Sequence, residues 1–306
     1  MSKRGERAAA IDIGTNSVLL AVAERAEKQL VPLLEGATIT RLGQGVDRSR
    51  ELAPEAVERT LSCLADYART LQDLGSPRLR VVGTSAMRDA AGGEEFRARA
   101  AALLGVAPEV ISGDEEARLT YHGALSGLDS PRTSVIVFDI GGGSTEVIQA
   151  HAGSVRSAQS LDIGSVRLTE RHLASDPPTT DELARLTSDI ASELSSLEAP
   201  AAGAWLVGVA GTLTTLCAIQ QELASYDATR VHGAELGLTE VEELCRKLSS
   251  LSVAARRQLP GLEPKRADVI AAGAHIALGV MRWAGASSLR VSDRGVRWGI
   301  LEQLLA

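Results

Sequence analysis

The sequence predicts an α/β fold made of two similar domains, and three observations lead to this prediction. An apolar run, an aspartate, a turn of small residues and a second apolar run occur at residues 9–22 and again at residues 135–147. The apolar pattern gives the order βββαβαβα in the first half, and the second half opens with three strands in the same way. A chain of 306 residues with 44% hydrophobic and 23% charged residues can bury one large or two ordinary cores.

In the first half, short apolar runs separated by glycine or polar turns predict strands, and longer segments with helical spacing predict helices. The helix expected at residues 54–74 has apolar side chains on one face, a proline suited to its first turn and Gly75 as its C-cap. The other expected elements are strands at 8–13, 17–24, 29–38, 79–83 and 109–111 and helices near 93–104 and 114–125.

The second half predicts more helix. Thr239 and Glu242 have the spacing of a capping box, and the apolar stretch 269–281, interrupted by His275, predicts a buried helix that does not span a bilayer. Strands are expected near 134–139, 144–150, 154–161, 205–209 and 288–292, and helices near 164–172 and 180–197 and from 212, 239, 265 and 295. The expected domains are residues 1–125 and 126–306, with the last helix, 295–306, able to pack back on the first domain.

The stretch 135–147 has the composition of a phosphate and metal site. Glycines lack the Cβ atoms that would keep a phosphate away from backbone N–H groups, and carboxylate oxygens bind hard cations. The alternative is a glycine-rich hairpin with a solvated acid at each end. The candidate phosphate-binding residues are Gly141, Gly142, Gly143 and Ser144, and the candidate metal ligands are Asp139 and Glu146.

Residues 9–22 repeat this pattern, with DIGTNS aligned over DIGGGS. Asp12 therefore holds the place of Asp139 and joins the candidate metal-associated carboxylates. The turn offers Thr15, Asn16 and Ser17 as candidate phosphate-binding residues. A repeat of this kind predicts that each domain offers a strand-turn-strand loop to a shared cleft.

Two more candidate residues follow apolar strands. GTSAMRDA (83–90) is expected to place Arg88 in a loop, where a guanidinium could grip phosphate oxygens; the alternative is an exposed surface arginine. ISGDEEARL (111–119) starts a helix with Glu115 and Glu116 in its first turn, and the alternative is that these acids only complement the helix dipole.

GVAGTLTTL (208–216) is a further strand, glycine turn and helix N-terminus. It suits a phosphate or a ribose edge and makes Gly211 and Thr212 candidate phosphate-binding residues; the alternative is an ordinary tight connection. LDIGSVRL (161–168) repeats the sequence Asp-Ile-Gly-Ser before a helix. We interpret this segment as having a structural role and not as a binding site.

Composition excludes several classes of protein. A net charge of −7 argues against nonspecific nucleic-acid binding, which needs many Lys and Arg contacts to phosphates. Three scattered cysteines and a polar start that leads straight into a strand predict a cytoplasmic protein with reduced thiols. The motifs GxxxxGK[ST], HExxH and GxSxG are absent, and the five histidines are scattered.

Together these motifs resemble the exopolyphosphatase/guanosine pentaphosphate phosphohydrolase family of the actin and sugar-kinase superfamily. The resemblance covers almost the whole chain. It implies two ribonuclease-H-like domains with the active site in the cleft between them, and hydrolysis of the terminal phosphoanhydride of inorganic polyphosphate or of the 5′ γ-phosphate of guanosine pentaphosphate. It rests, in this order, on IDIGTNSVLL, GTSAMRDA, ISGDEEARLTYHGAL, FDIGGGSTEV, LDIGSVRLTE, GVAGTLTTL, RADVIAAGA and VSDRGVRWGIL.

The resemblance also implies roles for single residues. Glu116 matches the family's general base, Arg88 its phosphate-gripping arginine, and Asp139 and Glu146 the carboxylates associated with Mg²⁺. The two turns match the family's phosphate loops. Charge neutralisation, in-line positioning and an oriented water are what phosphoryl transfer requires, and these residue types can supply them. A homodimer is a further expectation from the resemblance.

Two departures and two alternatives accompany this interpretation. The chain resembles a short form without the HD-like C-terminal region of longer members, and its closing motif reads Arg297-Trp298-Gly299 where the family commonly has an acid in the middle. We therefore leave this segment out of the site. The alternatives are an actin-like ATPase or kinase, which the SGDEEARL glutamate disfavours, and a sensor that binds guanosine tetra- or pentaphosphate without hydrolysing it.

Overall fold

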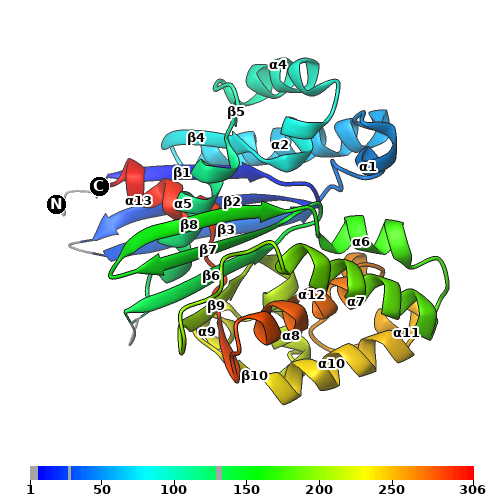
Figure 1. Cartoon of the computed structure of the whole chain (residues 1–306). Coiled ribbons are helices and arrows are strands. Elements are labelled where there is room, and N and C mark those ends of the chain that lie inside the picture. The colour runs from blue at the N-terminus through cyan, green and yellow to red at the C-terminus, as the bar shows by residue number, and fades with distance from the viewer. Residues whose placement is uncertain (1–5, 27–28, 129–132) are drawn as a thin grey trace. The chain divides into compact units, whose positions relative to one another are not determined.

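The computed structural model describes residues 6–26, 29–128 and 133–306. It divides into two compact units, unit 1 (Met1–Gly123 and Val296–Ala306) and unit 2 (Ala124–Gly295) (Figure 1). The second unit thus ends eleven residues before the expected domain boundary at residue 306, since the last helix belongs with unit 1.

Unit 1 is built on a mixed sheet with the strand order β3-β2-β1-β4-β5, which is the ribonuclease-H-like order. The first three strands are antiparallel neighbours, and β4 and β5 continue the sheet in parallel with β1. Its elements are β1 (Arg7–Ile13), β2 (Ser17–Ala26), β3 (Gln29–Ile39), α1 (Val46–Ser49), α2 (Pro54–Asp73), β4 (Arg78–Gly83), α3 (Ser85–Asp89), α4 (Gly93–Leu104), β5 (Glu109–Val110), α5 (Gly113–Leu125) and α13 (Val296–Leu304).

The two faces of this sheet bury different side chains, because successive residues of a strand point to opposite sides. Ala9, Ile11 and Ile13 of β1 face a core that includes apolar residues of α2 and α4. Ala8 and Ala10 face the other way, into a cluster with α5 and α13. The small alanine face leaves room for large side chains from the last helix.

Helix α13 fills that room and lies beside β1 in Figure 1. Trp298 is fully buried, and a Cβ atom at Gly299 would lie only 2.1 Å from the carbonyl oxygen of Leu119 in α5. Arg297 is 8% exposed and pairs with Glu35 of β3 at 2.5 Å. The closing motif therefore holds unit 1 together through packing and one ion pair.

We expect Gly299→Ala to destabilise the protein, because the added methyl group meets backbone atoms that cannot rotate away. Overpacking of this kind costs about 1–3 kcal/mol. Urea unfolding should show a correspondingly lower free energy of unfolding for Gly299→Ala than for wild type. Glu302→Ala on the same helix is the control and should change stability little; equal stability of Gly299→Ala and wild type would contradict the packing described here.

Unit 2 contains a second mixed sheet with the order β10-β11-β9-β6-β7-β8. Without the edge strand β10, it repeats the ribonuclease-H-like order of unit 1, so the predicted fold class is confirmed. Its elements are β6 (Ser134–Ile140), β7 (Thr145–His151), β8 (Ser154–Leu161), α6 (Ser165–His172), α7 (Thr180–Leu194), β9 (Trp205–Val209), α8 (Ala210–Gln220), α9 (Ala228–Val231), β10 (Glu235–Gly237), α10 (Leu238–Ser250), α11 (Val253–Arg256), the 3₁₀ helix η1 (Pro264–Arg266), α12 (Ile270–Trp283) and β11 (Ser288–Val291).

The expected long elements are present. The sequence analysis did not predict several short elements, because they contain too few residues to show a periodic pattern of apolar side chains; these are α1, α3, α9, β10 and α11. The segment from residue 265 starts as η1, and its helix proper begins only at Ile270. The capping box predicted at Thr239 and Glu242 is wrong. Helix α10 begins at Leu238, where the Glu240 carboxylate accepts the Gly237 N–H (2.7 Å), while Glu242 pairs with Arg282.

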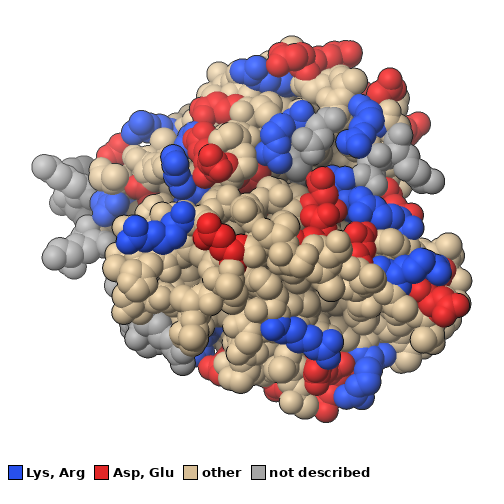
Figure 2. All heavy atoms as spheres, viewed as in Figure 1, with Lys and Arg blue, Asp and Glu red and all other residues tan. Residues whose placement is uncertain are grey.

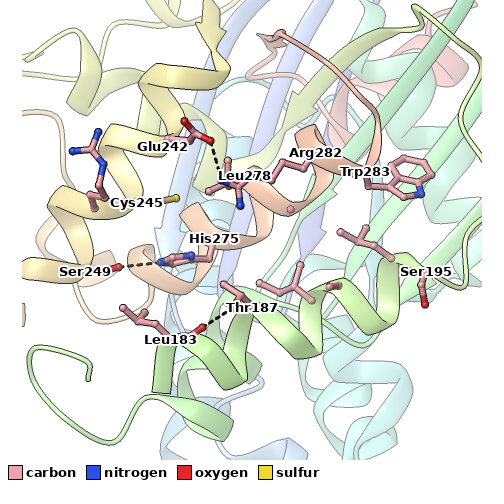
Figure 3. Close-up of a pocket in the computed structure, with 15 residues that line it drawn as sticks. Leu183, Thr187, Ser195, Glu242, Cys245, Ser249, His275, Leu278, Arg282 and Trp283 are labelled. Atoms are coloured by element: carbon pink, nitrogen blue, oxygen red, sulfur yellow. Dashed lines mark hydrogen bonds and ion pairs between the residues drawn. The ribbon is translucent and has the colours of Figure 1, made fainter. Parts of the chain in front are cut away.

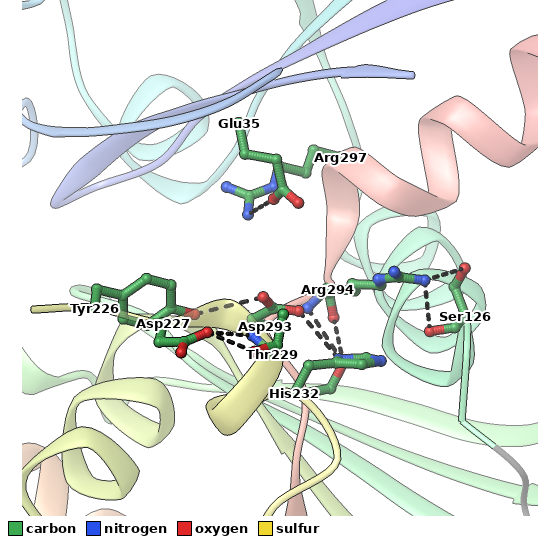
Figure 4. A network of polar contacts seen from close by, with 10 residues as sticks. Glu35, Ser126, Tyr226, Asp227, Thr229, His232, Asp293, Arg294 and Arg297 are labelled. Atoms are coloured by element: carbon green, nitrogen blue, oxygen red, sulfur yellow. Dashed lines mark hydrogen bonds and ion pairs between the residues drawn. The ribbon is translucent and has the colours of Figure 1, made fainter. Parts of the chain in front are cut away.

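Polar contacts tie together the two ends of unit 2 (Figure 4). Arg294 donates from Nη1 to the carbonyl oxygen of Ser126 at 3.1 Å and to its hydroxyl at 3.3 Å. His232 Nδ1 lies 3.0 Å from an Asp293 carboxylate oxygen. The first contacts hold the segment after β11 against the segment before β6, and the second holds it against the end of α9.

Surface charge and cysteines agree with the composition. On the face shown in Figure 2, acidic and basic side chains are interspersed, and no continuous basic stripe crosses the described residues visible there. Cys63, Cys217 and Cys245 are free and buried. Among the described helices, none has both the length and the apolar character needed to cross a bilayer.

Candidate functional site

The first predicted phosphate loop is the tight turn between β1 and β2. The Gly14 N–H donates to the Ser17 carbonyl oxygen at 3.0 Å, and a Cβ atom at Gly14 would approach that oxygen to 3.2 Å. The segment after β3 supports the turn from outside: the N–H groups of Thr40 and Arg41 donate to the carbonyl oxygen of Asn16. Asn16 is 7% exposed, so the loop is held in a defined conformation.

The second predicted loop, between β6 and β7, repeats the first turn. The Gly141 N–H donates to the Ser144 carbonyl oxygen, again at 3.0 Å. Within the part of the chain that the structure describes, the N–H groups of Gly142, Gly143 and Ser144 meet no acceptor. Such a run of backbone donors is suited to an anion. In the alternative of a plain hairpin, these three N–H groups would be left to bond to water.

Helix α6 holds the second loop in place through its N-terminal N–H groups. Those of Ser165 and Val166 donate to the carbonyl oxygens of Gly141 and Gly142 at 3.0 and 2.9 Å. A Cβ atom at Gly164 would lie 2.3 Å from the Gly142 carbonyl oxygen, so only glycine permits this approach. The segment 161–168 is thus structural, as interpreted from the sequence, and the structure it supports is the loop.

Arg167 was missed by the sequence analysis. It donates from Nε to the Gly143 carbonyl oxygen at 2.5 Å and lies 3.6 Å from Asp162. Its guanidinium adds positive charge beside the loop. The signal that could have found it is its position in LDIGSVRL, whose resemblance to DIGGGS was noted but given no residue role.

Asp139 and Glu146 are directly opposite each other in the β6–β7 ladder. Opposed residues of antiparallel strands have Cβ atoms about 4.5–5.5 Å apart. Glu146 is 3% exposed and accepts a hydrogen bond from the Ser160 hydroxyl at 2.8 Å. Two neighbouring carboxylates repel each other, and a cation between them relieves that repulsion.

These residues fit a hard cation such as Mg²⁺. It binds oxygen ligands, and proteins commonly hold it through one or two carboxylates together with substrate phosphates and water. Among residues 6–26, 29–128 and 133–306, no group of three or more His, Cys, Asp or Glu side chains is arranged to hold a metal ion. The pair alone would supply only part of a metal site, and phosphate oxygens would have to add the remaining ligands. Asp12 occupies the corresponding place on β1, where its neighbour on β2 is Leu19 rather than an acid.

The third candidate loop follows β9. Thr212 of α8 is 3% exposed, and its hydroxyl donates to the Ile140 carbonyl oxygen at 3.4 Å, next to the second loop. The Arg266 guanidinium lies on the Gly211 backbone, since a Cβ atom there would be 2.2 Å from Nη1. Sequence reasoning gave Arg266 no role, although it opens the motif RADVIAAGA just before the buried helix α12.

Arg88 and Glu116 lie together in unit 1. Arg88 Nη1 is 3.3 Å from a Glu116 carboxylate oxygen and 3.3 Å from the Ile111 carbonyl oxygen. The prediction that Arg88 lies in a loop is wrong: it is in the last turn of α3, which is possible because Gly83 leaves room for Met87. The guanidinium still lies at the end of a strand, beside a buried carboxylate.

The two neighbouring glutamates at the start of α5 have different environments. The Glu116 side chain is 9% exposed and pairs with Arg88. The Glu115 side chain is 43% exposed and pairs with Arg80 at 2.6 Å. The Ser112 hydroxyl caps the helix by accepting the Glu115 N–H. Of the two, Glu116 has the burial and the basic partner expected of a reactive carboxylate.

Within each unit, the structure brings part of the candidate set together. Unit 1 joins Arg88 with Glu116. Unit 2 gathers the second loop, the opposed acids Asp139 and Glu146, and Thr212 at the ends of neighbouring strands β6 and β9.

Comparison with known proteins identifies the family. The Ppx/GppA phosphatase family model matches residues 21–306. The chain belongs to the Ppx/GppA phosphatase family. It is 40% identical over 311 aligned residues to "Exopolyphosphatase 2" of Mycobacterium tuberculosis, covering 96% of this chain and 97% of that protein.

Solved structures of the Ppx/GppA family share this fold. An exopolyphosphatase-like protein superposes with a TM-score of 0.93 at 33% identity, covering 99% of this chain and 100% of that one. The Aquifex aeolicus Ppx/GppA enzyme superposes with a TM-score of 0.83 at 35% identity, covering 97% and 99%. Membership confirms the resemblance noted in the sequence and makes the protein a phosphoanhydride hydrolase.

Proposed function

We propose that the protein is an exopolyphosphatase that releases terminal orthophosphate from inorganic polyphosphate. The observation that carries the reaction type is the buried Glu116 carboxylate, positioned at a helix start and paired with Arg88. The substrate is supported by the relative named "Exopolyphosphatase 2", which aligns over 96% of this chain.

In this proposal Glu116 accepts a proton from water as the water oxygen attacks the terminal phosphorus. The new P–O bond forms while the bond to the bridging oxygen breaks, and the shortened chain leaves with that oxygen. Arg88 balances charge on the terminal phosphate. The donors of Gly142, Gly143 and Ser144 hold phosphate oxygens, and Thr15, Asn16 and Ser17 of the first loop do the same in unit 1.

Positive side chains help the loops to hold an anionic substrate. Arg167 and Arg266 lie beside the second and third loops, so a protein of net charge −7 still offers local positive charge to a polyanion. We propose that Asp139 and Glu146, with Asp12, hold Mg²⁺. The ion would neutralise charge that develops on phosphate oxygens.

The test is orthophosphate release from polyphosphate, guanosine pentaphosphate and ATP, each with and without Mg²⁺. We expect release from polyphosphate in the presence of Mg²⁺. Faster release from guanosine pentaphosphate would make the protein a guanosine pentaphosphate phosphohydrolase. Orthophosphate release from ATP but not from the other two substrates would support the ATPase alternative. Binding of guanosine pentaphosphate without release of orthophosphate would support a sensor.

Arg88→Lys should lower kcat/KM for polyphosphate about 10- to 100-fold. Lysine keeps the charge but loses the planar fork of donors, and a hydrogen bond to a charged group contributes about 1.5–3 kcal/mol. The control is Arg99→Lys, since Arg99 pairs with Glu58 on the surface. Initial-rate kinetics of both variants check this prediction, and an unchanged Arg88→Lys enzyme would make Arg88 an ordinary surface arginine.

Two expectations complete the proposal. A homodimer is expected from the resemblance, and sedimentation equilibrium would show a monomer if it is wrong. A cytoplasmic location is expected from the three free buried cysteines, and cell fractionation tests it.

A further inference from the structure

The segment between α11 and α12 lies along α8, the helix that follows the third loop. At Gly261, φ is 80°, and a Cβ atom would lie 2.3 Å from the carbonyl oxygen of Ala218, near the end of α8. At the other end of the segment, the Arg266 guanidinium lies on the backbone of Gly211 in the first turn of α8. The segment thus contacts α8 near both of its ends, and its last contact is at the third loop.

Helix α12 follows this segment and contacts the same loop. A Cβ atom at Gly273 would lie 2.6 Å from Cγ2 of Thr212. Helices α10 and α12 lie side by side, and a 3.0 Å hydrogen bond between the Ser249 hydroxyl and His275 Nε2 joins them (Figure 3). The third loop is therefore contacted both by the segment before α12 and by α12 itself.

Arg256 joins these elements from inside the core. It is the last residue of α11 and is 1% exposed. Its Nε donates to the carbonyl oxygen of Leu248, in the last turn of α10, at 2.6 Å, and its Nη1 donates to the carbonyl oxygen of Ala267 at 3.1 Å. Ala267 directly follows Arg266, so the Arg256 guanidinium fixes the backbone next to Arg266 to the end of α10.

The buried charge of Arg256 is costly, and packing alone does not require it. Burial lowers the pKa of Arg256, whereas the carboxylates of Asp176 and Asp268 raise it, and an arginine stays charged at neutral pH. Its Nη2 is buried and bonds to no residue that the structure describes. Apolar side chains of similar volume often replace buried charges without loss of stability. The two bonds to separate backbone segments instead indicate a role in positioning.

We propose that Arg256 is a positioning residue that holds Arg266 at the third loop, where the Arg266 guanidinium meets phosphate oxygens of the substrate. This inference rests on the proposed function, in which Arg266 supplies positive charge to a polyanion. When the Ala267 carbonyl group is held, the planar fork of Arg266 is kept in one place. Without that bond Arg266 keeps its charge but samples more conformations, and ordering them on binding lowers the affinity.

The experiment is a double-mutant cycle on the affinity for methylenediphosphonate, measured by isothermal titration calorimetry. This probe carries two linked phosphonate groups, and a phosphatase cannot hydrolyse its P–C–P bridge. We expect Arg266→Met to weaken binding at least about tenfold, because hydrogen bonds between charged groups are lost. Arg256→Met should weaken binding about 3- to 10-fold alone, and no further when Arg266→Met is present. The control is Arg257→Met, which removes the same charge from the next, exposed position and should bind like wild type.

Two further measurements separate positioning from a loss of stability. In initial-rate kinetics with tripolyphosphate, Arg256→Met should raise KM about 3- to 10-fold and leave kcat nearly unchanged, because Glu116 and the acids beside the second loop are intact. Arg256→Lys keeps the charge but lacks the fork, so its affinity for the probe should lie between those of wild type and Arg256→Met. Urea unfolding shows whether each variant is folded, and Arg256→Lys replaces Arg256→Met in the cycle if the latter is not.

Three outcomes would overturn the proposal. Wild-type affinity of Arg256→Met would show that Arg256 has no influence on the site. Equal weakening by Arg256→Met with and without Arg266→Met would mean that Arg256 acts independently of Arg266. Wild-type affinity of Arg266→Met would leave no phosphate contact to position. Because the probe is not hydrolysed, a protein that releases no orthophosphate from polyphosphate but shows the non-additive loss would refute the proposed function and still support the positioning role.

Discussion

Glu116→Gln should lower the rate of orthophosphate release about 10²–10⁴-fold, which is the usual contribution of a general base. Glutamine keeps the size of the side chain and can still bond to Arg88, but it cannot take a proton from water. Polyphosphate binding should persist or tighten, because a negative charge is removed from the neighbourhood of an anionic substrate. Rates from a phosphate-release assay and affinities from calorimetry separate the two effects.

Glu115→Gln is the matched control on the same helix. Its neighbour Arg80 also pairs with Glu109, so the loss of one exposed ion pair should cost at most about 1 kcal/mol of stability and little activity. If Glu115→Gln is inactive and Glu116→Gln active, the two glutamates have exchanged roles. If both variants keep wild-type rates, Glu116 is not the base, and the sensor and kinase alternatives regain support.

Asp139→Ala should reduce turnover by about 10²-fold or more and flatten its dependence on Mg²⁺. A bound metal ion contributes several kcal/mol of charge stabilisation in phosphoryl transfer, and each 1.36 kcal/mol corresponds to a factor of ten in rate. The change should leave folding intact, because Asp139 is at the end of β6 and Glu146 keeps its bond to Ser160. Turnover measured across a magnesium titration tests the effect on the metal dependence, and circular dichroism tests whether the variant remains folded.

Asp162→Ala provides the control for Asp139. Asp162 begins the same Asp-Ile-Gly sequence as Asp139. Its side chain, however, is 76% exposed, and its contact with Arg167 is long, at 3.6 Å. It should keep near-wild-type rates and magnesium dependence. Wild-type behaviour of Asp139→Ala across the titration would remove Asp139 from the metal site.

The fold could be predicted because its signals are local. The repeat of aspartate, small turn and apolar run marks the two hairpins, and both turns close with the same bond, from Gly14 to Ser17 and from Gly141 to Ser144. Helix α2 was visible through its apolar face and its proline. Helix α3 was missed because five residues are too few for a period to emerge.

The site was only partly predictable, because some of its contacts join distant segments. Arg266 reaches the backbone of Gly211, which is 55 residues away in the sequence, and no local pattern announces that approach. The resemblance already favoured Glu116 over Glu115, but the difference in burial between the two and the pairing of Glu115 with Arg80 are contacts that the sequence cannot show. Spacing indicates which residue types recur; it does not indicate which side chains meet.

The division of the chain has a consequence for biosynthesis. Unit 2 is one continuous segment, whereas unit 1 needs the last eleven residues to cover Ala8 and Ala10. Translation at about 5–20 residues per second delays that segment by on the order of ten seconds or more after β1 is made. We therefore expect the middle of the polypeptide to fold first on the ribosome. Until α13 has been made, the face of β1 that carries Ala8 and Ala10 lacks that helix and has only the packing that α5 provides.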